Sequence, residues 1–167
     1  MTSTSTRTVT RTHTATHLAD VIMGAIADIL ADLGIDMTTL YRDWTQDENA
    51  IQAWILEGSL AEVALECHQP RRIVSPVVEF PVAYRLDGSG DAEFTASRAR
   101  LARFREKIDR VPAGTTYRLY CTFNGPHSPQ PGWSAGTRAS TDGLRSINYG
   151  TLGSAPHATA SMRYRYR

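Results

Sequence analysis

The chain has 167 residues, of which 41% are hydrophobic, with 18 basic and 17 acidic side chains and a net charge of +1. This length suits one domain with a single core, and the composition excludes a wholly disordered chain and a minimal disulfide-held scaffold. Cys67 and Cys121 each lie in an apolar alternation, which favours reduced thiols and a cytoplasmic location. We expect no signal peptide and no membrane span, because the uninterrupted apolar stretches are short.

The near-zero net charge conceals an uneven distribution along the chain. Residues 1–13 carry +2, residues 14–66 carry −9, and residues 67–123 and 124–167 carry +4 each. Such an asymmetry arises either from an interaction surface or from two halves of one fold that attract each other. The sequence leaves both explanations open.

Threonine occupies every even position from Thr2 to Thr16. A period of two is typical of an extended chain, and neither face of this segment carries enough apolar area to be buried. We therefore expect residues 1–13 to form a flexible, extended tail.

Two helices are predicted to follow this tail. Thr16 is a candidate N-cap for a helix whose apolar stripe runs from Leu18 to Leu33 and which ends at Gly34. The sequence Thr45-Gln46-Asp47-Glu48 fits a capping box, which opens a second helix that ends at Gly58.

The apolar period changes to two after the second helix. A strand is expected from Ala61 to Cys67, with Glu62 and Glu66 on a solvated face, and a second strand from Val74 to Tyr84. Pro76 and Pro81 either place this second strand at a sheet edge or force irregularities in it.

The rest of the chain divides into two unlike parts. An arginine-rich third helix is predicted between Phe94 and Val111, and a third strand from Thr116 to Phe123. The last 44 residues hold six Gly and four Pro without a clear helix or strand pattern, yet they include large side chains such as Trp133. We expect this segment to dock through intermittent anchors.

The residues that most often carry chemistry form no convincing catalytic arrangement. His13 and His17 lie four apart with Asp20 nearby, but a third firm metal ligand is missing. Cys67 and Cys121 each have a histidine within a few residues in a spacing that matches no metal knuckle, and no phosphate loop or dinucleotide fingerprint occurs. We therefore expect no catalytic residue, no metal site and no cofactor, and favour a binding or regulatory module.

Arginine and aromatic residues alternate at the end of the chain, Arg163-Tyr164-Arg165-Tyr166-Arg167. Together with the arginine-rich third helix, this pattern would suit phosphates and stacked bases. The acidic first half of the chain would repel a polyanion, which argues against a nucleic-acid partner.

Four stretches of the sequence carry a resemblance to a known family: Thr12 to Thr16, Asp43-Trp44, Ala53 to Leu60, and the block from Gly132 to Gly143. Together with the order of the predicted elements, they resemble the bacterial HORMA domain proteins of cyclic-oligonucleotide-based anti-phage signalling (CBASS) operons, from about Thr10 to the C-terminus. The resemblance implies an α+β fold, with three helices packed on a mainly antiparallel sheet and a C-terminal safety-belt segment.

This resemblance also implies a division of the chain and a binding site. Residues 1–13 would be the flexible tail, 14–123 the HORMA core and 124–167 the safety belt, which wraps around a short closure peptide added as a strand beside the core. The peptide would lie near the strand from Thr116 to Phe123 and the third helix. The side chains expected around it are Phe104, Tyr117, Leu119 and Trp133.

The function that the resemblance implies is a peptide-binding conformational switch and not an enzyme. Its partners would be a closure-motif peptide, for example from a phage protein, a cGAS/DncV-like nucleotidyltransferase that the closed form binds and activates, and an AAA+ ATPase remodeller that reopens it. The remodeller would pull on the N-terminal tail, with a handle made of Thr4, Thr6, Arg7, Thr8 and Thr10. The alternative is a general peptide or nucleic-acid-binding adaptor without nucleotidyltransferase control.

Overall fold

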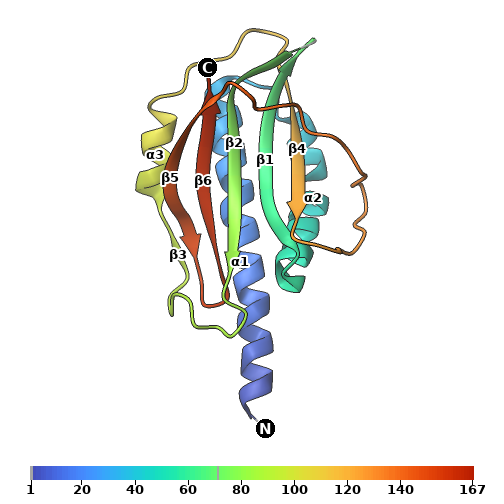
Figure 1. Cartoon of the computed structure of the whole chain (residues 1–167), viewed down its shortest axis with the longest axis vertical. Helices are drawn as coiled ribbons and strands as arrows, with labels where there is room; N and C mark the ends of the chain where they lie inside the picture. Colours follow the sequence, from blue (N-terminus) through green and yellow to red (C-terminus); the bar gives the residue numbers. More distant parts are fainter. Residues whose placement is uncertain (1, 71) are drawn as a thin grey trace.

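The computed structural model describes residues 2–70 and 72–167, and within them all side chains except those of residues 2–9 and 75. A six-stranded sheet has the order β3-β5-β6-β2-β1-β4, and every pairing of the described strands is antiparallel. Helices α1 and α2 cover one face of it, and α3 lies on the β5 side (Figure 1). The predicted α+β class is confirmed. The elements are α1 (Thr2–Leu33), α2 (Thr38–Glu57), α3 (Arg98–Arg105), β1 (Leu60–Gln69), β2 (Arg72–Tyr84), β3 (Thr95–Ala96), β4 (Thr116–Phe123), β5 (Arg145–Ser154) and β6 (Ala158–Tyr166).

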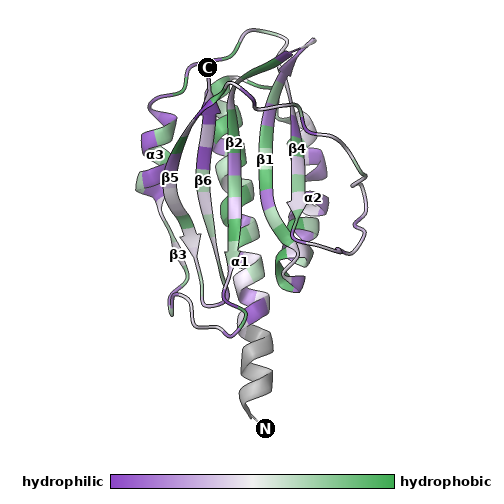
Figure 2. Ribbon diagram, viewed as in Figure 1, coloured by the Kyte–Doolittle hydropathy of each residue, from purple (hydrophilic) through white to green (hydrophobic). Residues whose placement is uncertain are grey.

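Helix α1 supplies the centre of the hydrophobic core. Leu18, Ile22 and Ile26, three of its apolar residues at helical spacing, are fully buried, and the apolar part of the helix lies behind the middle of the sheet (Figure 2). By length and composition alone, Thr10–Leu33 would suffice to cross a membrane, but 56% of that apolar window is buried inside the domain. This burial is what a core helix shows.

The predicted extended conformation of residues 1–13 is wrong, because α1 begins at Thr2; Met1 lies outside the described residues. Thr16 is not an N-cap, since its Oγ1 donates to the carbonyl oxygen of Thr12 at 3.0 Å within the helix. Extension of a helix that packing has already nucleated avoids the cost of a new nucleus and adds one hydrogen bond for each further residue, so α1 continues beyond its buried part. The alternating threonines meet no neighbouring strand among the described residues that would favour the extended form.

Helix α2 begins at Thr38 and not at the predicted Thr45. The carboxylate of Asp36 accepts hydrogen bonds from the backbone N–H and the hydroxyl of Thr38, at 2.9 and 2.7 Å, and so organises the first turn. Both predicted helix ends are confirmed, because Gly34 and Gly58 adopt left-handed φ values of 74° and 78°.

Strand β2 is central and not at a sheet edge, because it pairs with β1 on one side and β6 on the other. Its prolines force irregularities instead: the pairing with β1 is irregular around Pro76, and the pairing with β6 skips Pro81. The third predicted strand, from Thr116 to Phe123, is confirmed residue for residue as β4.

The expectation of no regular structure in the last 44 residues is only partly right. Strands β5 and β6 form a hairpin that joins the sheet beside β2. The remaining residues 124–144, here named the crossing segment, contain neither helix nor strand. They leave the end of β4, run along its outer side, and cross to the start of β5 (Figure 1).

Candidate functional site

The outer side of β4 forms the floor of a groove. β4 pairs only with β1 among the described strands, and no hydrogen bond of the described residues joins β4 to the crossing segment. The space between them is a groove of about 950 Å³, walled by α2 and its preceding loop on one side and by residues 127–137 on the other. Unpaired backbone N–H and C=O groups at such an edge are a template for an added strand.

The crossing segment is attached to α2 at its beginning. Trp54 Nε1 donates to the carbonyl oxygen of Ser128 at 2.7 Å, and the Ser128 N–H donates to Glu57 Oε1 at 3.0 Å. The His127 ring stacks on Phe123, with 3.5 Å between ring centroids and 3° between planes. We name this contact the aromatic anchor; it consists of Trp54, Glu57, Phe123, His127 and Ser128.

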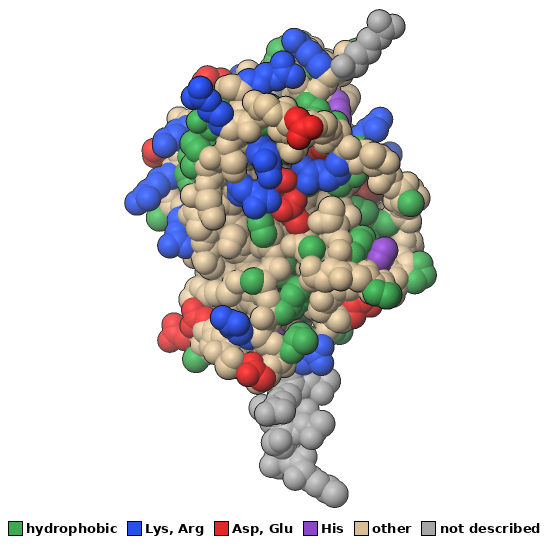
Figure 3. All heavy atoms as spheres, in the orientation of Figure 1, with side chains coloured by type: hydrophobic (Ala, Val, Ile, Leu, Met, Phe, Trp, Pro, Cys, Tyr) green, Lys and Arg blue, Asp and Glu red, His purple; other side chains and the backbone are tan. Residues whose placement is uncertain are grey.

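The end of the crossing segment is attached to the exposed face of the sheet by ion pairs. Arg138 Nη1 donates to Glu62 Oε1 at 3.0 Å and to Glu79 Oε2 at 3.1 Å. Arg163 donates to the same two carboxylates at 2.7 and 2.8 Å, and Figure 3 shows charged side chains of both signs gathered on this face. We name this cluster the ionic anchor; it consists of Glu62, Glu66, Glu79, Arg138, Arg163 and Arg165.

The predicted solvated face of the first strand is therefore covered. Glu66 is fully buried and Glu79 is 2% exposed. Burial alone would raise the pKa of Glu79, but hydrogen bonds from Arg163, Arg165 and Arg138 outweigh it and bring that pKa to about 2. Glu79 is thus ionised at neutral pH and holds three guanidinium groups together.

Attraction within the fold accounts for much of the charge asymmetry along the sequence. The carboxylates of Glu62 and Glu66 belong to the acidic first half, and Arg138 and Arg163 to the basic second half. On the helical side, Arg105 Nε of α3 lies 2.6 Å from a carboxylate oxygen of Asp32 in α1. For these pairs, the charge asymmetry therefore reflects attraction between two halves of one fold.

Gly132 lets the crossing segment pass close to α2. Its φ is +79°, and a Cβ at this position would come within 1.9 Å of the Gln46 side chain. A left-handed backbone and a close approach are both conditions that only glycine meets without strain.

The structure brings together three of the four side chains predicted to surround a peptide. Tyr117, Leu119 and Trp133 all line the groove. Phe104 does not line the groove, because α3 lies on the β5 side of the sheet and β4 forms the opposite edge. The buried ring of Phe104 packs instead on Tyr149 and Tyr164, with ring centroids 5.6 and 5.0 Å away.

Asp47 and Trp54 of α2 are groove residues that the sequence prediction missed. Both residues belong to an amphipathic helix, whose sequence pattern does not distinguish a groove-lining side chain from any other. Burial, reinforced by the charge of Asp43, raises the pKa of Asp47 to about 6, while the nearby Trp133 side chain acts in the opposite direction. The groove wall therefore carries a half-buried carboxylate.

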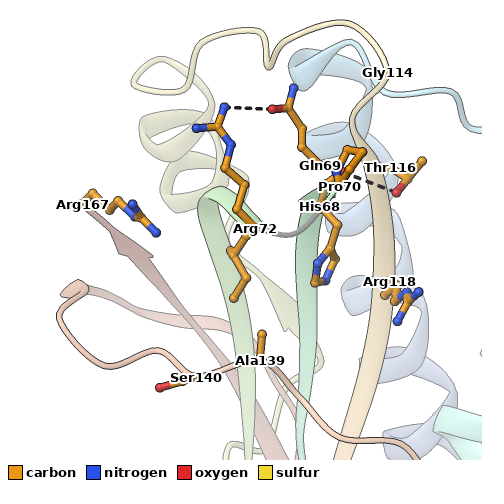
Figure 4. A pocket seen from close by; sticks show the side chains of 11 residues that line it. His68, Gln69, Pro70, Arg72, Gly114, Thr116, Arg118, Ala139, Ser140 and Arg167 are labelled. Carbon is orange, nitrogen blue, oxygen red and sulfur yellow. Dashed lines mark hydrogen bonds between the residues drawn. The ribbon is translucent and has the colours of Figure 1, made fainter.

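A second pocket, of about 700 Å³, opens at the turn between β1 and β2. Figure 4 shows that the guanidinium groups of Arg72, Arg118 and Arg167 lie on different sides of the opening, and Arg72 Nη2 donates to Gln69 Oε1 at 2.9 Å. These cations do not converge on one point, as an anion site would require.

The histidines considered for a metal site have other contacts. The rings of His13 and His17 pack edge-on against Phe94, at 6.5 and 5.6 Å between centroids, and His17 Nε2 lies 2.7 Å from the carbonyl oxygen of Thr95. Within residues 2–70 and 72–167, no group of three or more His, Cys, Asp or Glu side chains is arranged to hold a metal ion.

The arginines and tyrosines at the end of the chain are used within the fold. Along β6, Arg163 and Arg165 bind Glu79, whereas Tyr164 packs against Phe104. Alternation in a strand sends these side chains to opposite faces of the sheet. The pattern that suggested nucleic-acid contacts therefore serves the ionic anchor and the core.

Comparisons with known proteins identify the fold. A family model described as bacterial HORMA domain 2 matches residues 2–167, whereas no curated protein matches the chain. A chain of the mitotic checkpoint complex superposes with a TM-score of 0.74 at 7% identity, over 94% of this chain and 96% of that one. C. elegans HTP-1 bound to a HIM-3 closure motif superposes with a TM-score of 0.66 at 12% identity, over 88% of this chain and 87% of that one. A chain of the E. coli MS115-1 HORMA:CdnC:Trip13 complex superposes with a TM-score of 0.64 at 16% identity, over 93% of this chain and 89% of that one.

Proposed function

The chain belongs to the bacterial HORMA domain 2 family, and we propose that it is a conformational switch that takes a closure peptide as an added strand on β4. The observation that carries this proposal is the unpaired outer side of β4 beneath a segment fastened at both ends. The C. elegans relative, of similar fold, is bound to a closure motif.

The two anchors explain why such a switch would have long-lived states. A peptide strand beside β4 would lie between the sheet edge and the crossing segment, and backbone pairing along β4 would supply affinity. The segment is fixed through Ser128 at one end and Arg138 at the other. The peptide would therefore leave sideways only after one anchor has opened.

The similarity to a chain of the E. coli HORMA:CdnC:Trip13 complex supports a proposal about partners. The peptide-bound form binds and activates a cognate cGAS/DncV-like nucleotidyltransferase in anti-phage defence in the cytoplasm, and an AAA+ remodeller reopens it. The handle would be the first part of α1, which extends beyond the end of the sheet (Figure 1). The side chains of Thr4, Thr6, Arg7 and Thr8 lie outside the described set, so their role stays a prediction.

A pull-down with the cognate nucleotidyltransferase, with and without candidate closure peptides, followed by an assay of cyclic-oligonucleotide product, tests this function. We expect peptide-dependent binding that Tyr117→Ala weakens. Tyr41→Ala serves as the matched control, because Tyr41 is 60% exposed on α2 and does not line the groove. Peptide binding without any nucleotidyltransferase contact would favour the general adaptor, and binding in neither state would overturn the switch.

Deletion of residues 2–12 tests the handle. We expect the shortened chain to bind peptide as before, and ATP-dependent opening by the cognate AAA+ protein to be lost. Opening at an unchanged rate would show that the motor grips the protein elsewhere.

A further inference from the structure

The alternation of β4 determines which peptide side chains would meet α2. Tyr117, Leu119 and Cys121 pack toward the core on the helical side, and Arg118 and Tyr120 point the other way. A peptide strand paired with β4 alternates in the same manner. Every second peptide residue would therefore face the α2 wall of the groove.

The α2 wall carries an unbalanced negative charge at Asp47. Its carboxylate is half-buried in the groove, and no Lys, Arg or His among the described residues forms an ion pair with it. Asp43, one turn away, is already paired with Arg42 at 2.9 Å. Asp36 adds a further negative charge from the loop before α2.

The position of Asp47 along the groove follows from its place in α2. Burial raises the pKa of Tyr117 and of Cys121, and the charge of Asp47 raises both further. Along α2, Asp47 lies between Thr39 and Trp54, and all three residues line the groove. Its carboxylate therefore lies between the two ends of the groove wall.

Apolar surface flanks this carboxylate in both directions. Ile35 and the ring of Tyr117 line one end of the groove wall, and Trp54 and Trp133 line the other, where their rings meet at 5.4 Å. Apart from Asp36, whose carboxylate already accepts hydrogen bonds from Thr38, the wall is thus apolar, then acidic, then apolar along β4.

We propose that the groove selects closure peptides with the pattern apolar-x-Lys/Arg-x-apolar, in which the central cation pairs with Asp47 and the two apolar side chains contact Tyr117 and Trp54. The inference rests on the proposed function. The pattern reads the same in both chain directions, so it holds for parallel and antiparallel pairing with β4. A long basic side chain also fits, because its alkyl stem can cover apolar surface while its charge reaches the carboxylate.

Panning of a phage-displayed random peptide library on the full chain tests the proposal. The wild-type protein is expected to enrich peptides with a central Lys or Arg. The Asp47→Asn variant should enrich peptides without that preference, and the Asp47→Lys variant should enrich peptides with Asp or Glu at the same position. Asp43→Asn is the matched control, because it removes a similar charge from the same helix outside the groove lining. A synthetic peptide from the wild-type pool should bind Asp47→Asn about tenfold more weakly.

The outcomes separate this inference from the proposed function. Enrichment of apolar peptides without a central cation, or the same pool from wild type and Asp47→Asn, would overturn the charge selection and leave the peptide switch intact. Enrichment of no peptide on any variant would overturn the switch and this inference with it. Thermal unfolding of each variant shows that the panned proteins are folded.

Discussion

The two anchors hold the same segment by different physical means. The aromatic anchor holds the segment to the buried Trp54 ring through a partly buried hydrogen bond, and to Phe123 through the exposed ring of His127. The ionic anchor instead gathers six charged groups, of which Glu66 and Glu79 are buried and the three arginines are partly exposed. Opening the first exposes apolar surface, which is costly. Opening the second rehydrates charges, which offsets the loss of the ion pairs.

Glu66 sharpens this difference. Its carboxylate is fully buried, and neither oxygen accepts a hydrogen bond from the described residues; Arg138 Nε lies 3.6 Å away. Departure of the crossing segment would allow water to solvate this carboxylate. We therefore expect the segment to open first at Arg138 and to remain attached longer at Ser128.

The largest effect is expected from breaking the aromatic anchor. Trp54→Ala removes a side chain that is 2% exposed, so it should lower the free energy of unfolding by about 3–5 kcal/mol in urea titrations. Trp44→Ala is the control, because Trp44 is only partly buried and its Nε1 donates to Glu48 in its own helix. Equal losses for the two variants would show that the contact with Ser128 adds nothing.

Breaking the ionic anchor should cost less but act more locally. Arg138→Met leaves Glu62, Glu66 and Glu79 with one cation fewer, which should lower the free energy of unfolding by about 2–3 kcal/mol. Hydrogen exchange should rise in residues 137–144 and stay low around Ser128. Arg145→Met, at an exposed position, should change stability by less than about 0.5 kcal/mol. Exchange that rises first around Ser128 would reverse the expected order of opening.

Gly132 lies between the anchors and tests the path of the segment. Gly132→Ala should lower the free energy of unfolding by about 1–2 kcal/mol, because alanine must adopt the φ of +79°. The added contact with Gln46 involves the end of a flexible side chain, so the double variant with Gln46→Ala should recover only part of the loss. Full recovery would mean that the clash, and not the backbone strain, sets the cost.

The smallest effect is expected at Asp47. Its pKa of about 6 in the folded chain lies above its ordinary value of 3.8, so the folded state binds the proton more tightly and stability falls as pH rises from about 4 to 6. Asp47→Asn should therefore raise the melting temperature at pH 7 and leave it unchanged at pH 4. Because the carboxylate is only half-buried, we expect a gain of about 1 kcal/mol or less. A loss of stability at pH 7 would show that the ionised carboxylate is well solvated or paired.

Features set by local sequence were predicted well. β4 matches its predicted bounds because its alternation is strict, and Gly34 and Gly58 end their helices because their left-handed conformation suits glycine. The helix starts were wrong because Thr16 and Thr45 are sound capping residues locally, while packing and continued hydrogen bonding extend each helix beyond them.

Features set by distant partners were not predictable. Arg163 and Arg165 suggested contacts with phosphates, since the carboxylate of Glu79 that binds them lies more than 80 residues away in sequence. Arg138 was not predicted as a site residue for the same reason, because its partners Glu62 and Glu79 lie far from it in the sequence. Phe104 was assigned to the groove because nothing in its local pattern shows that α3 packs at the β5 side of the sheet.

The position of α1 has a mechanical consequence. The helix runs alongside the strands and begins beyond the end of the sheet (Figure 1), so its first turns are accessible to a force that pulls along the helix axis. Its buried side chains from Leu18 to Leu33 would then be loaded in shear, all at once, and not peeled away one after another. Such a geometry resists weak pulling and yields in a single cooperative slip, after which the central layer of the core is missing.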